Sequence, residues 1–160
     1  MSVFSPLPEV EIRILDKRLE DWGLPAYQSD MAAAIDLFAC ISEPLTIPSG
    51  SPAVLVPAGF SLFLGDQHLA AMILPRSGLG HRSGLVLGNL VGLIDADYQG
   101  PIMVSVWNRN GHEKDPVTIQ PGDRLAQMIF VPVVRPVFKV VEGFSGKTPR
   151  GGGGFGSTGV

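Results

Sequence analysis

The sequence predicts an all-β domain built as a jelly-roll-like β-barrel, and three observations support this prediction. Short segments in which apolar and polar residues alternate recur about every ten residues, as they do in barrels and sandwiches. Glycine and proline are frequent, with 20 and 14 copies in 160 residues, which disfavours long helices and suits tight turns. Hydrophobic residues make up 45% and charged residues 17% of the chain, a balance that argues against disorder.

The expected strands follow one another along the chain, and residues 10–14 (VEIRI) show the alternation most clearly. Further strands are expected at residues 53–57, 60–64, 70–74, 84–87, 102–107, 117–119 and 127–133. Turns with proline and glycine separate them at residues 48–50, 57–59 and 121–123. Helical turns are expected only at residues 66–70 and 79–83. The length of the chain favours a single domain.

Charge and cysteine content exclude several classes of protein. The formal net charge is −3, which argues against a nucleic-acid duplex or an anionic membrane as partner. Cys40 is the single cysteine, so an intrachain disulfide and a zinc site of several thiolates are excluded, and a small buried hydrophobe is expected.

The N-terminus has prolines and acids where a signal peptide has a basic start, and no apolar run approaches membrane-spanning length. We therefore expect a soluble, cytoplasmic protein.

Two segments suit the binding and cleavage of a phosphorylated ligand. Residues 75–80 (PRSGLG) follow an apolar strand. Arg76, Ser77 and Gly78 can offer a cation, a hydroxyl and accessible backbone N–H groups to an anion, unless the turn is purely structural. Residues 88–100 (GNLVGLIDADYQG) read as a hairpin with Asp95 at a strand end, where a carboxylate can orient and deprotonate water. Asp97 is interpreted as a turn residue that bonds its own backbone.

Three polar residues beside apolar strands need partners. Asp36 lies within AAAIDLFA and is expected to form a buried ion pair with an arginine. Arg124 follows the turn PGD and is either such a partner or a phosphate ligand. Gln127 lies between apolar residues, and its amide is costly to bury unless its hydrogen bonds are met.

The composition changes after Phe144, where the chain reads SGKTPRGGGGFGSTGV. Composition alone predicts a disordered tail. Arg150 and Phe155 are nevertheless unusual in a plain linker, because a cation and a flat ring on a flexible tether can close over a ligand that carries phosphates and a base.

The five segments AAAIDLFA, PRSGLG, GNLVGLIDADYQG, PGDRLAQ and RGGGGFGSTG together resemble the five motifs of the trimeric dUTPase family (deoxyuridine 5′-triphosphate nucleotidohydrolases), bacterial members above all. The first motif departs slightly, with Ala34 and Ile35 where a glycine and a short variable pair are commoner, but it keeps Asp36. The resemblance implies a homotrimer with active sites at subunit interfaces. It also implies a barrel over residues 1–143 and, over residues 144–160, a C-terminal arm that closes over a neighbouring site.

By resemblance, water attacks the α-phosphorus of dUTP to give dUMP and diphosphate, with Asp95 as general base. Such an activity limits uracil incorporation into DNA and supplies dUMP for thymidylate synthesis. Mg2+ is the implied cofactor, held mainly by the phosphates and waters with no direct protein ligand. The implied substrate-binding residues are Arg76, Ser77, Gly78, Asn89, Leu93, Ile94, Asp95, Tyr98, Met103, Gln127, Arg150, Phe155, Ser157 and Thr158, while Asp36 orders an arginine at the interface.

The resemblance also implies individual roles in recognition. Asn89 and the neighbouring backbone read the uracil edge, and Tyr98 packs under the deoxyribose so that a 2′-hydroxyl is excluded. Ser77 lies near the oxygen that bridges the α- and β-phosphorus. Arg150 binds the phosphate chain, and Phe155 stacks on uracil.

Two other functions use the same fold. A dCTP deaminase carries a catalytic glutamate on the strand after the hairpin, at the place that Ser105 occupies here, and serine cannot shuttle the protons of a deamination. A non-catalytic nucleotide-binding protein could keep the phosphate ligands and lose the base, whereas this chain has both Asp95 and the arm.

Overall fold

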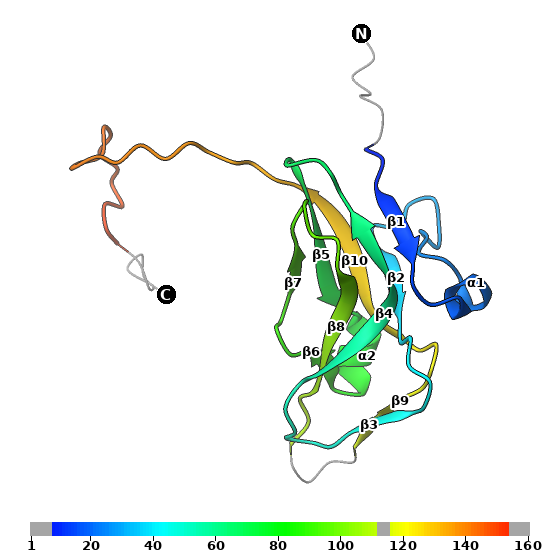
Figure 1. Cartoon of the computed structure of the whole chain (residues 1–160). Coiled ribbons are helices and arrows are strands. Elements are labelled where there is room, and N and C mark those ends of the chain that lie inside the picture. The colour runs from blue at the N-terminus through cyan, green and yellow to red at the C-terminus, as the bar shows by residue number, and fades with distance from the viewer. Residues whose placement is uncertain (1–7, 112–115, 154–160) are drawn as a thin grey trace.

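The computed structural model describes residues 8–111 and 116–153, which form two four-stranded antiparallel sheets and a two-stranded ribbon (Figure 1). The first sheet has, in spatial order, β1 (Glu11–Ile14), β4 (Val54–Phe63), β8 (Pro101–Asn108) and β6 (Leu85–Leu87). The second has β2 (Ile35–Phe38), β10 (Arg124–Pro132), β5 (Leu69–Pro75) and β7 (Gly92–Ile94). The ribbon pairs β3 (Leu45–Ile47) with β9 (Val117–Ile119). The predicted all-β class is confirmed.

The core follows from the alternation along the strands. In β8, Ile102, Val104 and Val106 are buried, whereas Met103 and Trp107, which point to the other face, are 36% and 37% exposed. Successive side chains of a strand point to opposite faces, so this period of two gives the strand one buried face. The largest side chains buried to less than 2% exposure include those of Phe60, Leu37, Ile47, Ile102, Ile119 and Met128.

One predicted turn is wrong, because β4 runs through residues 57–59 as a single strand. The register between β4 and β8 shifts between Pro57 and Ser61, so the extra residues form an irregularity within the strand instead of a connection. Gly59 makes this possible: its φ is +82°, and a Cβ there would meet Sγ of Cys40 at 2.4 Å. A glycine in the left-handed region is typical of such bulges.

The helices differ in part from the expectation. The helical turn expected at residues 79–83 is present as α2 (Ser77–Arg82). At residues 66–70 the structure has a tight turn and no helix: the N–H of Leu69 donates to the carbonyl of Asp66 at 2.9 Å, and β5 already begins at Leu69. Asp66 Oδ1 also accepts the backbone N–H of His68 at 2.9 Å. Strand β3 and helix α1 (Arg18–Trp22) are not predicted by the sequence pattern.

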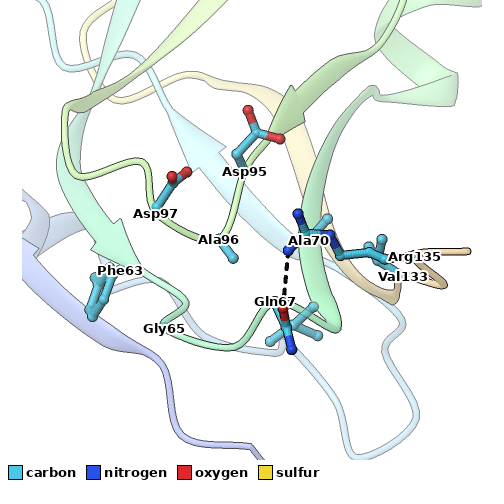
Figure 2. Close-up of a pocket in the computed structure, with 10 residues that line it drawn as sticks. Phe63, Gly65, Gln67, Ala70, Asp95, Ala96, Asp97, Val133 and Arg135 are labelled. Carbon is cyan, nitrogen blue, oxygen red and sulfur yellow. Dashed lines mark hydrogen bonds between the residues drawn. The ribbon is translucent and has the colours of Figure 1, made fainter. Parts of the chain in front are cut away.

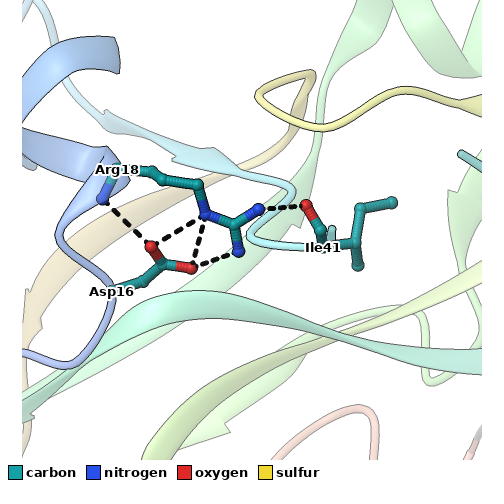
Figure 3. Close-up of polar contacts among 3 residues, drawn as sticks. All are labelled: Asp16, Arg18 and Ile41. Atoms are coloured by element: carbon teal, nitrogen blue, oxygen red, sulfur yellow. Dashed lines mark hydrogen bonds and ion pairs between the residues drawn. The ribbon is translucent and has the colours of Figure 1, made fainter. Parts of the chain in front are cut away.

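Arginine 18 fixes α1 to the barrel (Figure 3). Its guanidinium pairs with Asp16, donates to the carbonyl of Ile41 at 2.6 Å and lies 5.2 Å from the ring centroid of Trp22. The hydrogen bond between the side chains of Arg18 and Asp16 is the main reason that the pKa of Asp16 lies below its usual value. The fully buried side chain of Leu19 completes the attachment.

Cys40 is buried, as expected, and burial raises the pKa of its thiol to about 11. The thiolate is the reactive form, and an ordinary cysteine has a pKa of about 8.5. At pH 8 we therefore expect the folded protein to react with a thiol reagent at least roughly 100-fold more slowly than the unfolded chain. The measurement is labelling with and without denaturant, and equal rates would contradict the burial.

The chain leaves the barrel after β10 and extends away from it (Figure 1). The root of this segment is held by Val133, whose N–H donates to the carbonyl of His68 at 2.8 Å, and by Arg135, which donates to Gln67 Oε1 at 3.1 Å. Beyond it, large apolar side chains are almost fully exposed at Val137, Phe138, Val140 and Phe144. Within the described residues, no helix is long and apolar enough to cross a membrane.

Candidate active site

Asp95 follows β7 directly and is one of the residues that line a pocket. Strand β7 pairs with β5 in the register Ile94 with Ala71 and Gly92 with Ile73. Gly92 is needed for this close approach, because a Cβ there would meet the Ile73 side chain at 3.1 Å. Asp95 is exposed and lies at the edge of a cavity of about 530 Å³, with its carboxylate directed away from Gln67 and Arg135 (Figure 2).

The same cavity brings together groups from three segments (Figure 2). Asp95 and Asp97 come from the loop after β7, Gln67 from the turn before β5, and Arg135 from the root of the C-terminal segment. Sequence reasoning did not single out Gln67 or Arg135 for this pocket. Only the tertiary fold brings them to Asp95, and no local pattern signals them.

Tyr98 is held at the end of the hairpin. Its hydroxyl donates to the carbonyl of Pro101 at 3.0 Å, and its N–H donates to the carbonyl of Asp95 at 3.2 Å. A Cβ on Gly100 would come within 2.4 Å of the Tyr98 hydroxyl, so the ring lies where only glycine leaves room. The phenol remains 41% exposed. Asp97 lies in the turn, as expected. The turn is closed by the bond from the N–H of Tyr98 to the carbonyl of Asp95, and not by the Asp97 side chain.

The tip of the hairpin is exposed and tightly bent. The N–H of Val91 donates to the carbonyl of Asn89 at 2.7 Å, and Leu90 between them has a φ of +64°. Leu93 is 65% exposed. Gly88 packs against the outer face of β8, where a Cβ would meet Oγ of Ser105 at 3.0 Å.

A second group of predicted residues gathers at the end of β5. Asp36 on β2 forms ion pairs with Arg76 at 3.2 Å and with Arg124 at 3.3 Å, and its side chain is only 12% exposed. The expected ion pair is therefore present, with two arginines in place of one. Gln127 donates from Nε2 to the carbonyl of Pro75, the residue before Arg76, at 3.0 Å. This bond supplies the hydrogen-bond partner that the side-chain amide of Gln127 requires.

Ser77 and Gly78 begin α2 beside these arginines. Arg76 precedes the helix in an extended conformation, with φ −84° and ψ 128°. Asp36 carries one negative charge against two guanidinium groups, so this corner of the protein keeps an excess of positive charge. Such an arrangement of cations, a hydroxyl and backbone N–H groups suits a polyanion.

The two groups lie at opposite ends of β5. Ile94, just before Asp95, pairs with Ala71 near the start of this strand, whereas Arg76 follows its last residue, Pro75. At a strand rise of about 3.3 Å per residue, Asp95 and Arg76 are roughly 15–20 Å apart along β5. One chain therefore does not bring the predicted base and the predicted phosphate ligands together.

The predicted residues of the C-terminal arm are only partly described. Arg150 lies in a turn, closed by the N–H of Gly151 on the carbonyl of Thr148 at 3.1 Å, and its Nε donates to the carbonyl of Gly153 at 2.9 Å. This turn lies away from the barrel in Figure 1. Phe155, Ser157 and Thr158 lie outside the described residues.

The chain is similar to known proteins in both sequence and fold. The model of the dUTPase family matches residues 20–159. The deoxyuridine 5′-triphosphate nucleotidohydrolase of Glaesserella parasuis serovar 5 (strain SH0165) is 52% identical over 154 residues, which cover 96% of this chain and 99% of that protein. The enzyme of the same name from Coxiella burnetii (strain RSA 493 / Nine Mile phase I) is 54% identical over 151 residues, with 94% and 96% covered.

Solved structures share the fold at much lower identity. The dUTPase of Staphylococcus bacteriophage 80alpha, solved with dUPNHPP, superposes with a TM-score of 0.79 at 22% identity over 96% of this chain and 100% of that one. A mutant dUTPase of phage phi11 of S. aureus, described with a structural Mg(II) ion, gives 0.72 at 21% identity over 85% and 98%. The fold, the family model and the relatives thus agree, and the chain belongs to the dUTPase family.

Proposed function

We propose that this chain, a dUTPase by family, hydrolyses dUTP to dUMP and diphosphate by attack of water on the α-phosphorus. The observation that carries the proposal is the near-full-length identity of 52–54% to deoxyuridine 5′-triphosphate nucleotidohydrolases. In the cytoplasm this activity would limit uracil incorporation into DNA and supply dUMP for thymidylate synthesis.

Asp95 is the general base of the proposed mechanism. Asp95 is exposed to solvent beside a cavity of about 530 Å³, so a water molecule can reach its carboxylate. A carboxylate within hydrogen-bond reach of the attacking water takes up its proton as the new bond to phosphorus forms. The proton on water is thereby transferred to Asp95, and diphosphate leaves from the α-phosphorus.

The corner around Arg76 binds the phosphates. Arg76, Ser77 and Gly78 donate to the phosphate oxygens, and the amide of Gln127 keeps the end of β5 in place through its bond to Pro75. Asp36 orients Arg76 through the ion pair at 3.2 Å. Positively charged donors that are fixed in advance stabilise the charge that develops on the phosphates, which is typically the largest catalytic contribution.

A complete site requires more than one chain in this proposal. A triphosphate cannot span the roughly 15–20 Å of β5 between Asp95 and Arg76. Asp95 of one subunit therefore acts on a nucleotide whose phosphates are bound at Arg76 of a neighbour, in a homotrimer. The arm of residues 144–160 closes over the site, with Arg150 on the phosphates, Phe155 on uracil, and Ser157 and Thr158 on the terminal phosphate.

Magnesium is the proposed cofactor. Mg2+ takes oxygen ligands, keeps several waters and typically binds through substrate phosphates and one or two carboxylates. The described residues hold no group of three or more His, Cys, Asp or Glu side chains able to bind a metal ion. In this proposal the oxygens of the triphosphate and waters hold the ion, and the arginines at Arg76 and Arg124 bind the triphosphate that carries it. When bound, the ion would neutralise negative charge on the phosphates.

The proposal is tested by measuring diphosphate release from dUTP, UTP, dCTP and dTTP, with and without Mg2+. We expect turnover of dUTP alone, dependent on the metal. Ammonia release from dCTP would instead identify a deaminase, and binding of dUTP without turnover would identify a nucleotide-binding protein.

Replacing Tyr98 with alanine is expected to lower the preference for dUTP over UTP by at least about tenfold, because the rejection of a 2′-hydroxyl is steric. The measurement is kcat/KM for both nucleotides. Tyr98→Phe is the matched control, since it keeps the ring and removes only the hydrogen bond to Pro101. If UTP stays equally poor with Tyr98→Ala and the melting temperature is unchanged, the ring does not select the sugar.

A further inference from the structure

We propose that Arg109 and Asn110 are positioning residues that hold α2, and with it the phosphate-binding corner, from the far end of the helix. The Asn110 side chain donates from Nδ2 to the carbonyl of Ser83 at 2.8 Å. Arg109 donates from Nη2 to the carbonyl of Gly80 at 3.0 Å, and its backbone N–H donates to the carbonyl of Gly84 at 3.0 Å.

These bonds occupy the carbonyl of Gly80 in the last turn of α2 and the carbonyls of Ser83 and Gly84, the two residues that follow the helix. The last carbonyls of a helix have no partner within it, and a cation near them is favourable. Gly84 shows how closely the amide packs: its φ is +72°, and a Cβ there would meet Oδ1 of Asn110 at 2.2 Å. Asn110 thus lies directly against the residue at which the chain leaves α2.

Arg109 and Asn110, which we call the clamp, are themselves anchored in the barrel. Asn108, the last residue of β8, is fully buried and donates from Nδ2 to the carbonyl of Ile47 at 3.0 Å. Its Oδ1 accepts the N–H of Asn110 at 3.1 Å. A chain of hydrogen bonds therefore runs from β3 through Asn108 and Asn110 to the end of α2.

The helix needs such support because it is short. With six residues, α2 is far below the roughly 12–15 residues at which an isolated helix becomes even marginally stable in water. Ser77 and Gly78 form its first turn, and the N–H of Gly80 donates to the carbonyl of Arg76 at 3.0 Å. A shift of the helix would therefore move the donors that face the phosphates, a conclusion that rests on the proposed function.

The test compares the full-length variants Asn110→Ala, Arg109→Ala and Arg109→Lys with the parent protein. Calorimetry measures the Kd of dUMP and of the non-hydrolysable analogue dUpNHpp. We expect Asn110→Ala and Arg109→Ala each to raise the Kd of dUpNHpp about fivefold to tenfold and to leave the Kd of dUMP almost unchanged. This is the size of effect expected when one hydrogen bond is lost and a carbonyl group is left without a partner. Arg109→Lys keeps a cationic donor and should restore much of the affinity for dUpNHpp.

Hydrogen exchange supplies a readout that does not depend on the nucleotide. Amides of residues 77–83 should exchange faster in Asn110→Ala than in the parent. Thr46→Val is the matched control, because it removes the 3.0 Å side-chain bond to Thr118 in the β3–β9 ribbon. This bond is not part of the hydrogen-bond chain that runs from Ile47 through Asn108 and Asn110 to α2. This control should leave both the exchange of α2 and the affinity for dUpNHpp unchanged.

Three results would overturn the proposal: unchanged exchange in α2, faster exchange with unchanged affinity for dUpNHpp, or equal losses for dUMP and dUpNHpp. Failure of the proposed function is seen separately, as absence of dUTP turnover in the parent protein. The exchange of α2 reports on the clamp in either case.

Discussion

Replacing Asp95 with asparagine is expected to slow dUTP hydrolysis by about 10²–10⁴-fold, the usual contribution of a positioned general base. The amide keeps the shape of the side chain and can still accept a hydrogen bond, so the loss would belong to the basicity of the carboxylate. The Kd of dUpNHpp and the melting temperature should remain close to those of the parent, because the Asp95 side chain is exposed. The measurement is kcat from diphosphate release, together with calorimetry.

Asp97→Asn is the matched control for this experiment. Asp97 lies two residues further along the same loop and is also among the residues that line the cavity, so the variant removes the same charge close by. We expect its kcat to stay within about threefold of the parent. If Asp95→Asn is equally active, or if both variants lose activity alike, the assignment of Asp95 as the base is wrong.

The fold class was predictable because it depends on patterns within single strands. The period of two in β8 is visible in the sequence, and the structure buries Ile102, Val104 and Val106 accordingly. The course of β4 was not predictable in this way. Pro57-Ala58-Gly59 has the composition of a turn, and only the packing of Gly59 against Cys40 makes it a bulge within one strand.

In the candidate site, too, the features that depend on a single segment were predictable, and those that depend on contacts between segments were not. An ion pair of Asp36 with an arginine could be predicted because a carboxylate in an apolar strand requires a partner. In the structure Asp36 pairs with both Arg76 and Arg124. The separation of Asp95 from Arg76 depends on the register between β5 and β7, which no single segment encodes. The bond between Asn110 and Ser83 joins residues 27 positions apart, and it too has no local signal.

Removing residues 148–160 is expected to lower kcat/KM for dUTP by about 10²-fold or more and to leave the melting temperature of the free protein unchanged. A base stacked on an aromatic ring is typically worth ~1–3 kcal/mol, and the cation at Arg150 and the exclusion of bulk water by closure add to this loss. The described part of this segment makes its hydrogen bonds locally, between Thr148, Arg150, Gly151 and Gly153. The bonds lost with residues 148–153 are therefore bonds within the segment.

Two single substitutions separate stacking from the other effects of the arm. Phe155→Ala should reproduce part of the loss in kcat/KM, again without a change in melting temperature. Phe155→Trp should show fluorescence quenching when dUpNHpp is added, since indole stacks on uracil; the parent protein, with Trp22 and Trp107 only, supplies the background. Full activity of the truncated chain, with an unchanged signal from Phe155→Trp, would mean that these residues form a plain tail. In that case recognition of uracil would rest on the hairpin around Asn89 and Tyr98 alone.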